Sequence, residues 1–148
     1  MNNGSYMQLD RCKDVPTLTS AFKLFFRELN QPLINRDVID SALALNLNLS
    51  NIGYDLQDET IAQIKSSIEL LPTLNYKVLH YILLHLKCVA DNGENKMGAS
   101  NLAVIFGQTL VENISIGNQN MDEVMKETER SNKLIEILIM HVDEIFHK

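Results

Sequence analysis

Residues 95–110, "NKMGASNLAVIFGQTL", place five consecutive apolar residues, Leu102 to Phe106, directly after a polar one, Asn101. A helix that is apolar on every side belongs in the centre of a domain, so this stretch predicts a buried helix. The amide of Asn101 then needs an explanation. It caps the helix or is a satisfied buried amide, as such residues usually are, or it faces outward at a binding site.

Segments on either side of this stretch also show helical periodicity, and little of the chain alternates as a strand does. From Leu18 to Leu29 the apolar residues step by three and four, and the breaker Asn30-Gln31-Pro32 ends that helix. We expect further helices at 36 to about 45, 58–71, 75–92 and at least from 131 to 146, with the helix at 75–92 apolar over most of its surface. The Asn-rich residues 45–55 and the residues around Gly117 are predicted to be loops. The sequence therefore predicts an all-α fold, an irregular helical bundle.

Length and composition set limits on organisation and function. A chain of 148 residues fits one domain, residues 1–148, in which residues 1–15 are an N-terminal extension with no assigned element. The net charge of −6 argues against nonspecific binding to nucleic acid or to anionic membranes, because both depend on excess Lys and Arg. No segment is apolar enough for membrane insertion, and the N-terminus lacks a signal-peptide pattern. We therefore expect a cytoplasmic protein, with Cys12 and Cys88 as free thiols.

Motifs for self-contained chemistry are missing from the sequence. There is no Gly-rich phosphate loop, no nucleophile elbow and no acidic calcium loop. His85 and Cys88 lie one helical turn apart, but two ligands on one helix are too few for a zinc site. Met121 and Met125 are interpreted as core residues of a helix. We expect no cofactor, no bound metal and no catalytic residue in this chain.

Lys23 and Arg27 are the most informative polar pair, because a spacing of four places both on one helical face. In one interpretation this is an ordinary solvated face, whose charge is balanced by Glu28 and Asp37 nearby. In the other, the two cations meet an acidic surface or phosphate groups of a partner. Spacing alone does not decide between these interpretations.

Three stretches in order resemble the Rho GTPase-activating (RhoGAP) domain family. Residues 18–34, "LTSAFKLFFRELNQPLI", are similar to the family pattern L-K-x-F-L-R-E-L-P-x-P-L. Residues 71–92, "LPTLNYKVLHYILLHLKCVADN", resemble LP-x-x-N-x-x-x-L-x-x-L-x-x-H-L, and residues 95–110 resemble N-x-M-x-x-x-N-L-A-x-V-F-G-P-x-L. The similarity runs from about Pro16 to Phe146. Asn30 and Gln108 replace two prolines of these patterns, and the effect of either change cannot be predicted from sequence.

The resemblance implies an all-helical domain that docks on a Rho-family small GTPase, of Rho, Rac or Cdc42 type, and stimulates its GTP hydrolysis. It implies a GTPase-binding face that includes Lys23 as a cation against the partner, Arg27 as a brace for the catalytic loop, and Asn101 as a partner-facing amide. Asn95 matches the earlier asparagine of the same motif and is expected to order this surface. No short motif indicates which GTPase is bound.

The family's arginine finger lies in a G-x-x-R-x-S-G loop upstream of the helix that carries Lys23, and this sequence contains no such loop. Arg11 is the one upstream arginine, and it has neither the flanking glycines nor the distance of the family's finger. We therefore expect a RhoGAP-like domain that is incomplete at its N-terminus and weak or inactive by itself. The alternative is a catalytically inactive module that binds small GTPases or acts as a scaffold.

Helices absent from a packed domain leave apolar surface uncovered, and large apolar patches are rare on monomers. We expect the segment Met1 to Val15 to fold back over such a surface, or two chains to dimerise or swap elements across it.

Overall fold

The structure is a computed structural model and describes residues 15–44, 58–94, 96–111 and 120–147. In these ranges the backbone forms helices and no β-strand; one isolated bridge joins Ile34 to Val111, and the Ile34 N–H donates to the Leu110 carbonyl at 2.9 Å. The prediction of an all-α bundle is confirmed. The elements are α1 (Val15–Arg27), α2 (Arg36–Ala42), α3 (Asp58–Ile68), α4 (Thr73–Asp91), α5 (Ala99–Leu110), α6 (Met121–Met140) and α7 (Val142–Phe146).

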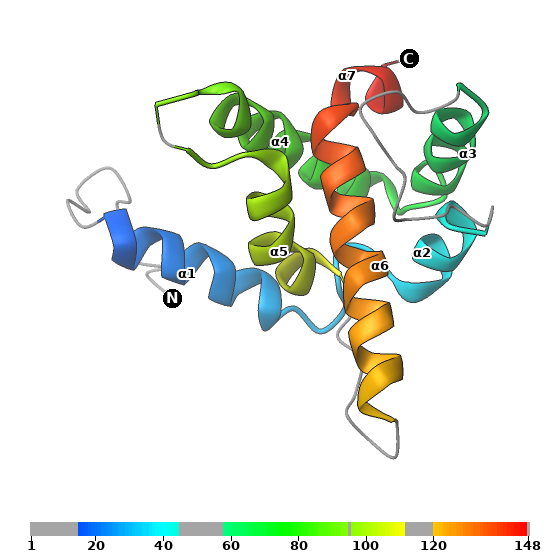
Figure 1. The fold of residues 1–148 in the computed structure, drawn as a ribbon, viewed down its shortest axis with the longest axis horizontal. Coiled ribbons are helices and arrows are strands. Elements are labelled where there is room, and N and C mark those ends of the chain that lie inside the picture. The colour runs from blue at the N-terminus through cyan, green and yellow to red at the C-terminus, as the bar shows by residue number, and fades with distance from the viewer. Residues whose placement is uncertain (1–14, 45–57, 95, 112–119, 148) are drawn as a thin grey trace, which may run out of the picture.

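The helices α5 and α6 run in opposite directions side by side at the centre of the fold, with α1 and α4 beside α5 and with α2 and α3 on the far side of α6 (Figure 1). The second half of α6 contributes much of this centre, because apolar residues recur there at nearly every position and most of them are buried. Burial of each such side chain contributes about 1.5–3 kcal/mol. The buried residues of α6 are Leu134, Ile135, Ile137, Leu138 and Ile139.

A glycine sets how closely α5 approaches α6. A Cβ atom at Gly107 would overlap Oδ1 of Asn132, and it would lie 3.2 Å from Cγ and 3.4 Å from the backbone Cα of that residue. A side chain at position 107 would therefore have to displace the amide of Asn132, and glycine avoids this overlap. Oδ1 of Asn132 is buried and has no hydrogen-bond partner in the structure.

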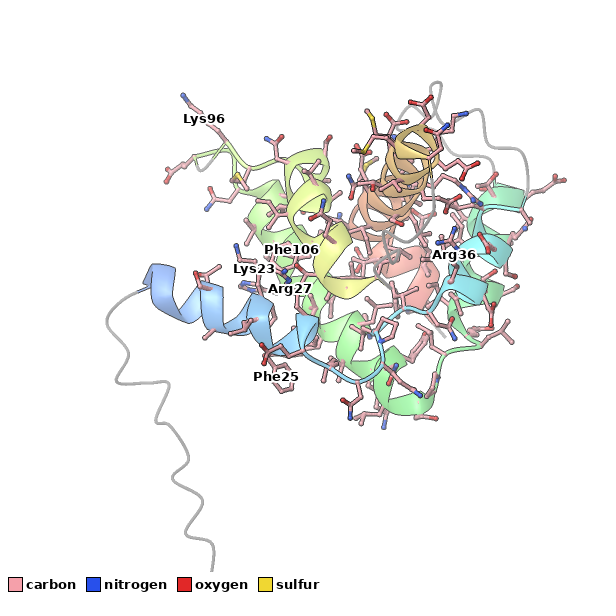
Figure 2. All side chains as sticks on the ribbon, turned by 90° about the horizontal axis from the view of Figure 1, so that it is seen from below. Lys23, Phe25, Arg27, Arg36, Lys96 and Phe106 are labelled. Atoms are coloured by element: carbon pink, nitrogen blue, oxygen red, sulfur yellow. The ribbon has the colours of Figure 1, made fainter. Side chains whose placement is uncertain are left out.

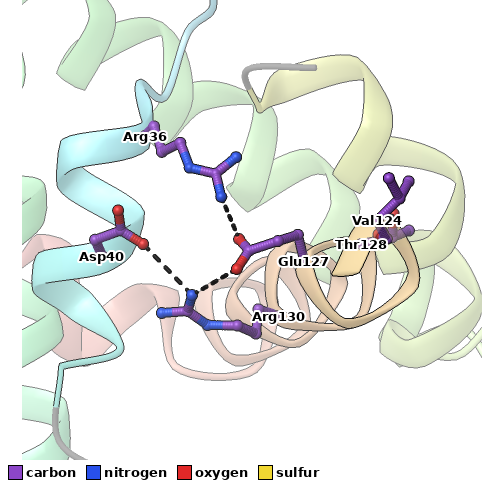
Figure 3. Close-up of polar contacts among 6 residues, drawn as sticks. All are labelled: Arg36, Asp40, Val124, Glu127, Thr128 and Arg130. Atoms are coloured by element: carbon purple, nitrogen blue, oxygen red, sulfur yellow. Dashed lines mark hydrogen bonds and ion pairs between the residues drawn. The ribbon is translucent and has the colours of Figure 1, made fainter. Parts of the chain in front are cut away.

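The short helix α2 is held to α6 by charges as well as by apolar contacts. It begins after Asn35, whose side-chain oxygen accepts a hydrogen bond from the Val38 N–H at 3.2 Å. Glu127 lies 2.9 Å from Arg36 and 3.0 Å from Arg130, and Arg130 also lies 3.5 Å from Asp40 (Figure 3). Partial burial makes such a network worth more than isolated surface ion pairs.

The short helix α7 closes one end of the bundle through aromatic contacts with α4. The ring of Phe146 stacks on His80 with a centroid distance of 4.7 Å and lies 5.0 Å from the ring of Tyr76. Partial burial raises the pKa of Tyr76, and the charge of Glu69 raises it further. The Tyr76 hydroxyl therefore stays neutral at neutral pH and adds no charge to this contact.

Most of the predicted helices are present, with different ends. The second one ends at Ala42 rather than near residue 45, and the last begins at Met121, ten residues before the position from which we predict it firmly. Met121 and Met125 are 70% and 58% exposed, so their assignment to the core is wrong: α6 begins in a part of the helix that extends beyond the other helices (Figure 1). The predicted loop at 45–55, the one around Gly117 and the extension at 1–14 lie outside the described residues.

The helix predicted at 75–92, apolar over most of its surface, is present as α4, but it is buried on one side only. One row of α4 is buried, while Leu74, Tyr81 and His85 are exposed. Within the described ranges no helix has the length and apolar character to cross a bilayer, and no cluster of His, Cys, Asp and Glu has the geometry to hold a metal ion. Cys88 is an exposed free thiol, and Cys12 is not among the described residues.

We expect Gly107→Ala to lower the free energy of unfolding by about 1–3 kcal/mol, because the new methyl group overpacks the contact with Asn132. Helix propensity alone favours alanine by about 1 kcal/mol, so the sign of the change distinguishes the two effects. Urea denaturation measures it. Asn132→Ala should restore most of the lost stability, because it removes the overlapped atoms. Gly93→Ala is the control, since a Cβ atom at that position would meet no other atom within 4 Å. Equal effects of the two glycine substitutions would contradict the prediction.

Candidate functional site

An aromatic cluster holds α1 against α5. The rings of Phe22 and Phe106 lie 6.5 Å apart, and Phe26 contacts Phe22 at 4.9 Å and Phe25 at 5.2 Å, all edge to face. Phe26 and Phe106 are buried, whereas Phe25 is 62% exposed. Edge-to-face pairs add about 0.5–1.5 kcal/mol each beyond the area they bury, so the cluster fixes the position of α1 on α5.

Lys23 and Arg27 lie on the side of α1 that is turned toward α5, and Phe25 points away on the other side (Figure 2). Lys23 is half-buried and Arg27 is exposed. The predicted common face for the two cations is therefore present. Since Lys23 follows Phe22 directly, the same contact that anchors α1 also brings the first cation next to α5.

Asn101 lies in the first turn of α5, with its side chain exposed. The helix begins after Gly98, so Asn101 is not the N-cap residue, and it is not a buried amide either. Both of those interpretations are wrong, and the outward-facing one agrees with the structure. Exposure continues along the same row of α5 at Val104, Ile105 and Gln108.

We use the name α1–α5 face for the cations of α1 and the exposed row of the adjacent helix α5: Lys23, Arg27, Asn101, Val104, Ile105 and Gln108. Sequence reasoning did not assign Val104, Ile105 and Gln108 to the site. Their spacing of three, four and seven residues from Asn101 does place them on the same helical face as Asn101. Val104 is 56% exposed, which is unusual for a residue inside so apolar a run. The predicted site residue Asn95 lies outside the described residues, so its position relative to this face stays a prediction.

The charge of the α1–α5 face is opposite to that of the whole chain. The helices α1 and α5 together carry Lys23 and Arg27 and no carboxylate, while the net charge of the chain is −6. Glu28 follows α1 directly and is exposed. Among the other described arginines, Arg36 and Arg130 are held by carboxylates between α2 and α6. The face can therefore attract an acidic partner surface, which most of the protein would repel.

A pocket of about 420 Å³ lies between α4, the start of α5 and the end of α6, and its lining includes Lys87, Asp91, His141 and Glu144. These charged groups already pair with one another: His141 Nδ1 lies 2.8 Å from Glu144 Oε1, and Lys87 Nζ lies 3.7 Å from Asp91. The lining offers no activated nucleophile. The arrangement of the described residues therefore favours a surface that binds a macromolecule over an enclosed active site.

Comparison with known proteins identifies relatives along most of the chain. Rho GTPase-activating protein 21-A of Xenopus laevis is 33% identical over 141 residues, which cover 95% of this chain and 7% of that protein. Rho GTPase-activating protein 23 of Mus musculus is 32% identical over 141 residues, 95% of this chain and 9% of that protein. Beta-chimaerin of Mus musculus is 35% identical over 99 residues, 66% of this chain and 28% of that protein. The chain thus spans only a small part of the relatives it matches.

A solved structure shows the same fold. The crystal structure of the BH domain from Graf, the GTPase regulator associated with focal adhesion kinase, superposes with a TM-score of 0.72 at 30% sequence identity. The match covers 91% of this chain and 68% of that one. The family model described as "RhoGAP domain" matches residues 1–115, which include α1 to α5 and thus every residue of the α1–α5 face. The chain belongs to the RhoGAP domain family.

Proposed function

We propose that the chain is the docking part of a GTPase-activating domain, and that its α1–α5 face binds a Rho-family small GTPase of Rho, Rac or Cdc42 type in the cytoplasm. The observation that carries the proposal is the pair of cations on a face without carboxylates, next to the exposed amide of Asn101. Family membership and the names of the relatives, which are Rho GTPase-activating proteins, support the same partner.

Each residue of the face has a proposed role that its position permits. Lys23 is half-buried on the side of α1 that is turned toward α5, so part of its stem is already packed while its ammonium group can meet an acidic group of the GTPase. Arg27, one turn further and exposed, braces the loop of the partner or of the parent domain that enters the nucleotide site. Asn101 donates and accepts hydrogen bonds at the interface. For Asn95, which lies outside the described residues, the proposed role is that of the family motif, ordering of the same surface.

Stimulation of hydrolysis needs an arginine finger, which in GTPase activation is worth about 10³ to 10⁵ in rate. The sequence contains no G-x-x-R-x-S-G loop. Arg36 and Arg130 are engaged by Glu127 and Asp40, and breaking that network to supply a finger would leave charges unpaired. We therefore propose that this chain by itself binds the GTPase but accelerates hydrolysis only weakly. The second candidate, a binding or scaffold module with no stimulation at all, rests on the same missing loop.

We expect the chain to bind a Rho-type GTPase loaded with a non-hydrolysable GTP analogue, and Lys23→Ala and Asn101→Ala each to weaken binding by about tenfold, as loss of a central interface contact does. Isothermal titration across Rho, Rac and Cdc42 types measures the affinities. Single-turnover GTP hydrolysis with the same proteins should show an acceleration far below about 10³-fold, because no finger is present.

Lys126→Ala is the matched control, since Lys126 is exposed on the projecting start of α6, away from the α1–α5 face. All these variants should change the free energy of unfolding by no more than about 0.5 kcal/mol, because the side chains are not part of the core. Unchanged affinity in both Lys23→Ala and Asn101→Ala would contradict the proposed binding face. Full acceleration by the chain would show that a finger is present that we have not identified.

The dimer proposal has its own structural basis. The helix α1 and the turn after it present an apolar row, Phe22, Phe25 and Leu29, of which each member is more than one-third exposed. We propose that two chains associate through this row. Sedimentation equilibrium should then show dimers that Phe25→Asp abolishes and that Leu70→Asp, at an equally exposed apolar position between α3 and α4, leaves intact. A wild-type chain that stays monomeric at high concentration would exclude this association.

A further inference from the structure

The turn between α4 and α5 holds a cation in a conformation that few side chains adopt. Lys96 has φ of 54°, and among the described residues it is the one non-glycine with positive φ. Asparagine, aspartate and glycine are the usual residues in this region, because other side chains crowd the following carbonyl. Such conformations persist where the surrounding structure imposes them, and they gather at binding and switch regions.

The left-handed conformation directs Lys96 outward. Its side chain is exposed and extends from the tip of the turn, away from the body of the protein (Figure 2). The turn and the amino-terminal half of α1 project toward the same side of the molecule, and α5 runs from the end of the turn to α1 (Figure 1). Lys23 is half-buried on the side of α1 that is turned toward α5. Lys96 lies beyond the start of α5, five residues before Asn101, and thus at the edge of the α1–α5 face.

Two carboxylates lie close to Lys96 in the chain. Asp91, at the end of α4, is 3.7 Å from Lys87 and is thus partly neutralised. The exposed Glu94 has a backbone N–H that donates to the Asn92 side-chain oxygen at 3.1 Å, which shapes the start of the turn. Lys96 follows these two carboxylates in the chain. The negative charge of Glu94 partly offsets the attraction that Lys96 exerts on an acidic partner.

We propose that Lys96 is a third cation for the same partner: it guides the acidic surface of the GTPase onto the α1–α5 face and sets the association rate. This inference rests on the proposed function. A charge at the edge of an interface acts mainly through the rate of encounter and its dependence on salt, whereas contacts at the centre determine the dissociation rate. Lys96 and Lys23 thus have different kinetic roles.

The test is stopped-flow association of the whole chain with a Rho-type GTPase that carries a fluorescent non-hydrolysable GTP analogue, at several salt concentrations. Lys96→Asn removes the charge and keeps a residue that suits positive φ, so it separates charge from backbone strain. We expect association to slow by about threefold in Lys96→Asn and by up to about tenfold in Lys96→Glu, with little change in dissociation. Lys96→Arg should restore the wild-type rate, and Glu94→Gln should raise it.

The control is Lys126→Glu, which makes the same charge reversal on the projecting start of α6 and should leave the association rate within about twofold of wild type. Equal effects of Lys96→Glu and Lys126→Glu would mean that only net charge matters, and would overturn the inference. Binding that depends on Lys23 and Asn101 but not on Lys96 would overturn it while the proposed function stands. Absence of binding by the wild-type chain would remove both.

Discussion

The close approach of α5 to α6 at Gly107 is the constraint on which the rest of the structure depends. A helix can present its small residue to only one neighbour, and here that neighbour is Asn132 of α6. The neighbouring row of α5, with Asn101, Val104 and Gln108, is exposed. The rotation of α5 that buries Gly107 against α6 therefore also determines which residues of α5 are exposed, Asn101 among them.

The position of α1 follows from the same helix. Phe106 precedes Gly107 in the chain and receives Phe22 of α1 at 6.5 Å, so α5 orders α6 on one side and α1 on the other. Because Lys23 is next to Phe22, the contact of Phe22 with Phe106 also positions the cationic part of the face, and among the described residues Lys23 has no ion pair that would do so. The contact with Phe106 thus explains how α1, a short helix with exposed phenylalanines, holds Lys23 and Arg27 in a defined position.

The fold was largely predictable from periodicity, and the errors have a common cause. Apolar spacing placed α1, α3, α4, α5 and the second half of α6, because each buries one stripe. It failed at Val104, Tyr81 and Met125, which are apolar but exposed. Their helices are apolar on more sides than the neighbouring helices cover. Motif resemblance is what singled out Asn101 and assigned roles to Lys23 and Arg27, and those roles stay predictions. No sequence pattern marks Lys96, because a positive φ at a lysine is a property of the folded turn that residue type does not indicate.

The network of Arg36, Glu127, Arg130 and Asp40 lies between α2 and α6, whereas Lys23 and Arg27 lie beyond α5. Added salt acts on the two groups differently. The ions of the network are in direct contact and the core of the protein is apolar, so added salt changes the stability of the fold little. The attraction between Lys23 or Arg27 and a charge across water is screened instead, because the Debye length falls to about 3 Å near 1 M salt. A partner held through Lys23 and Arg27, as we propose, would therefore be released by salt while the protein stays folded, which makes elution by salt a gentle means of recovering the components of such a complex in native form.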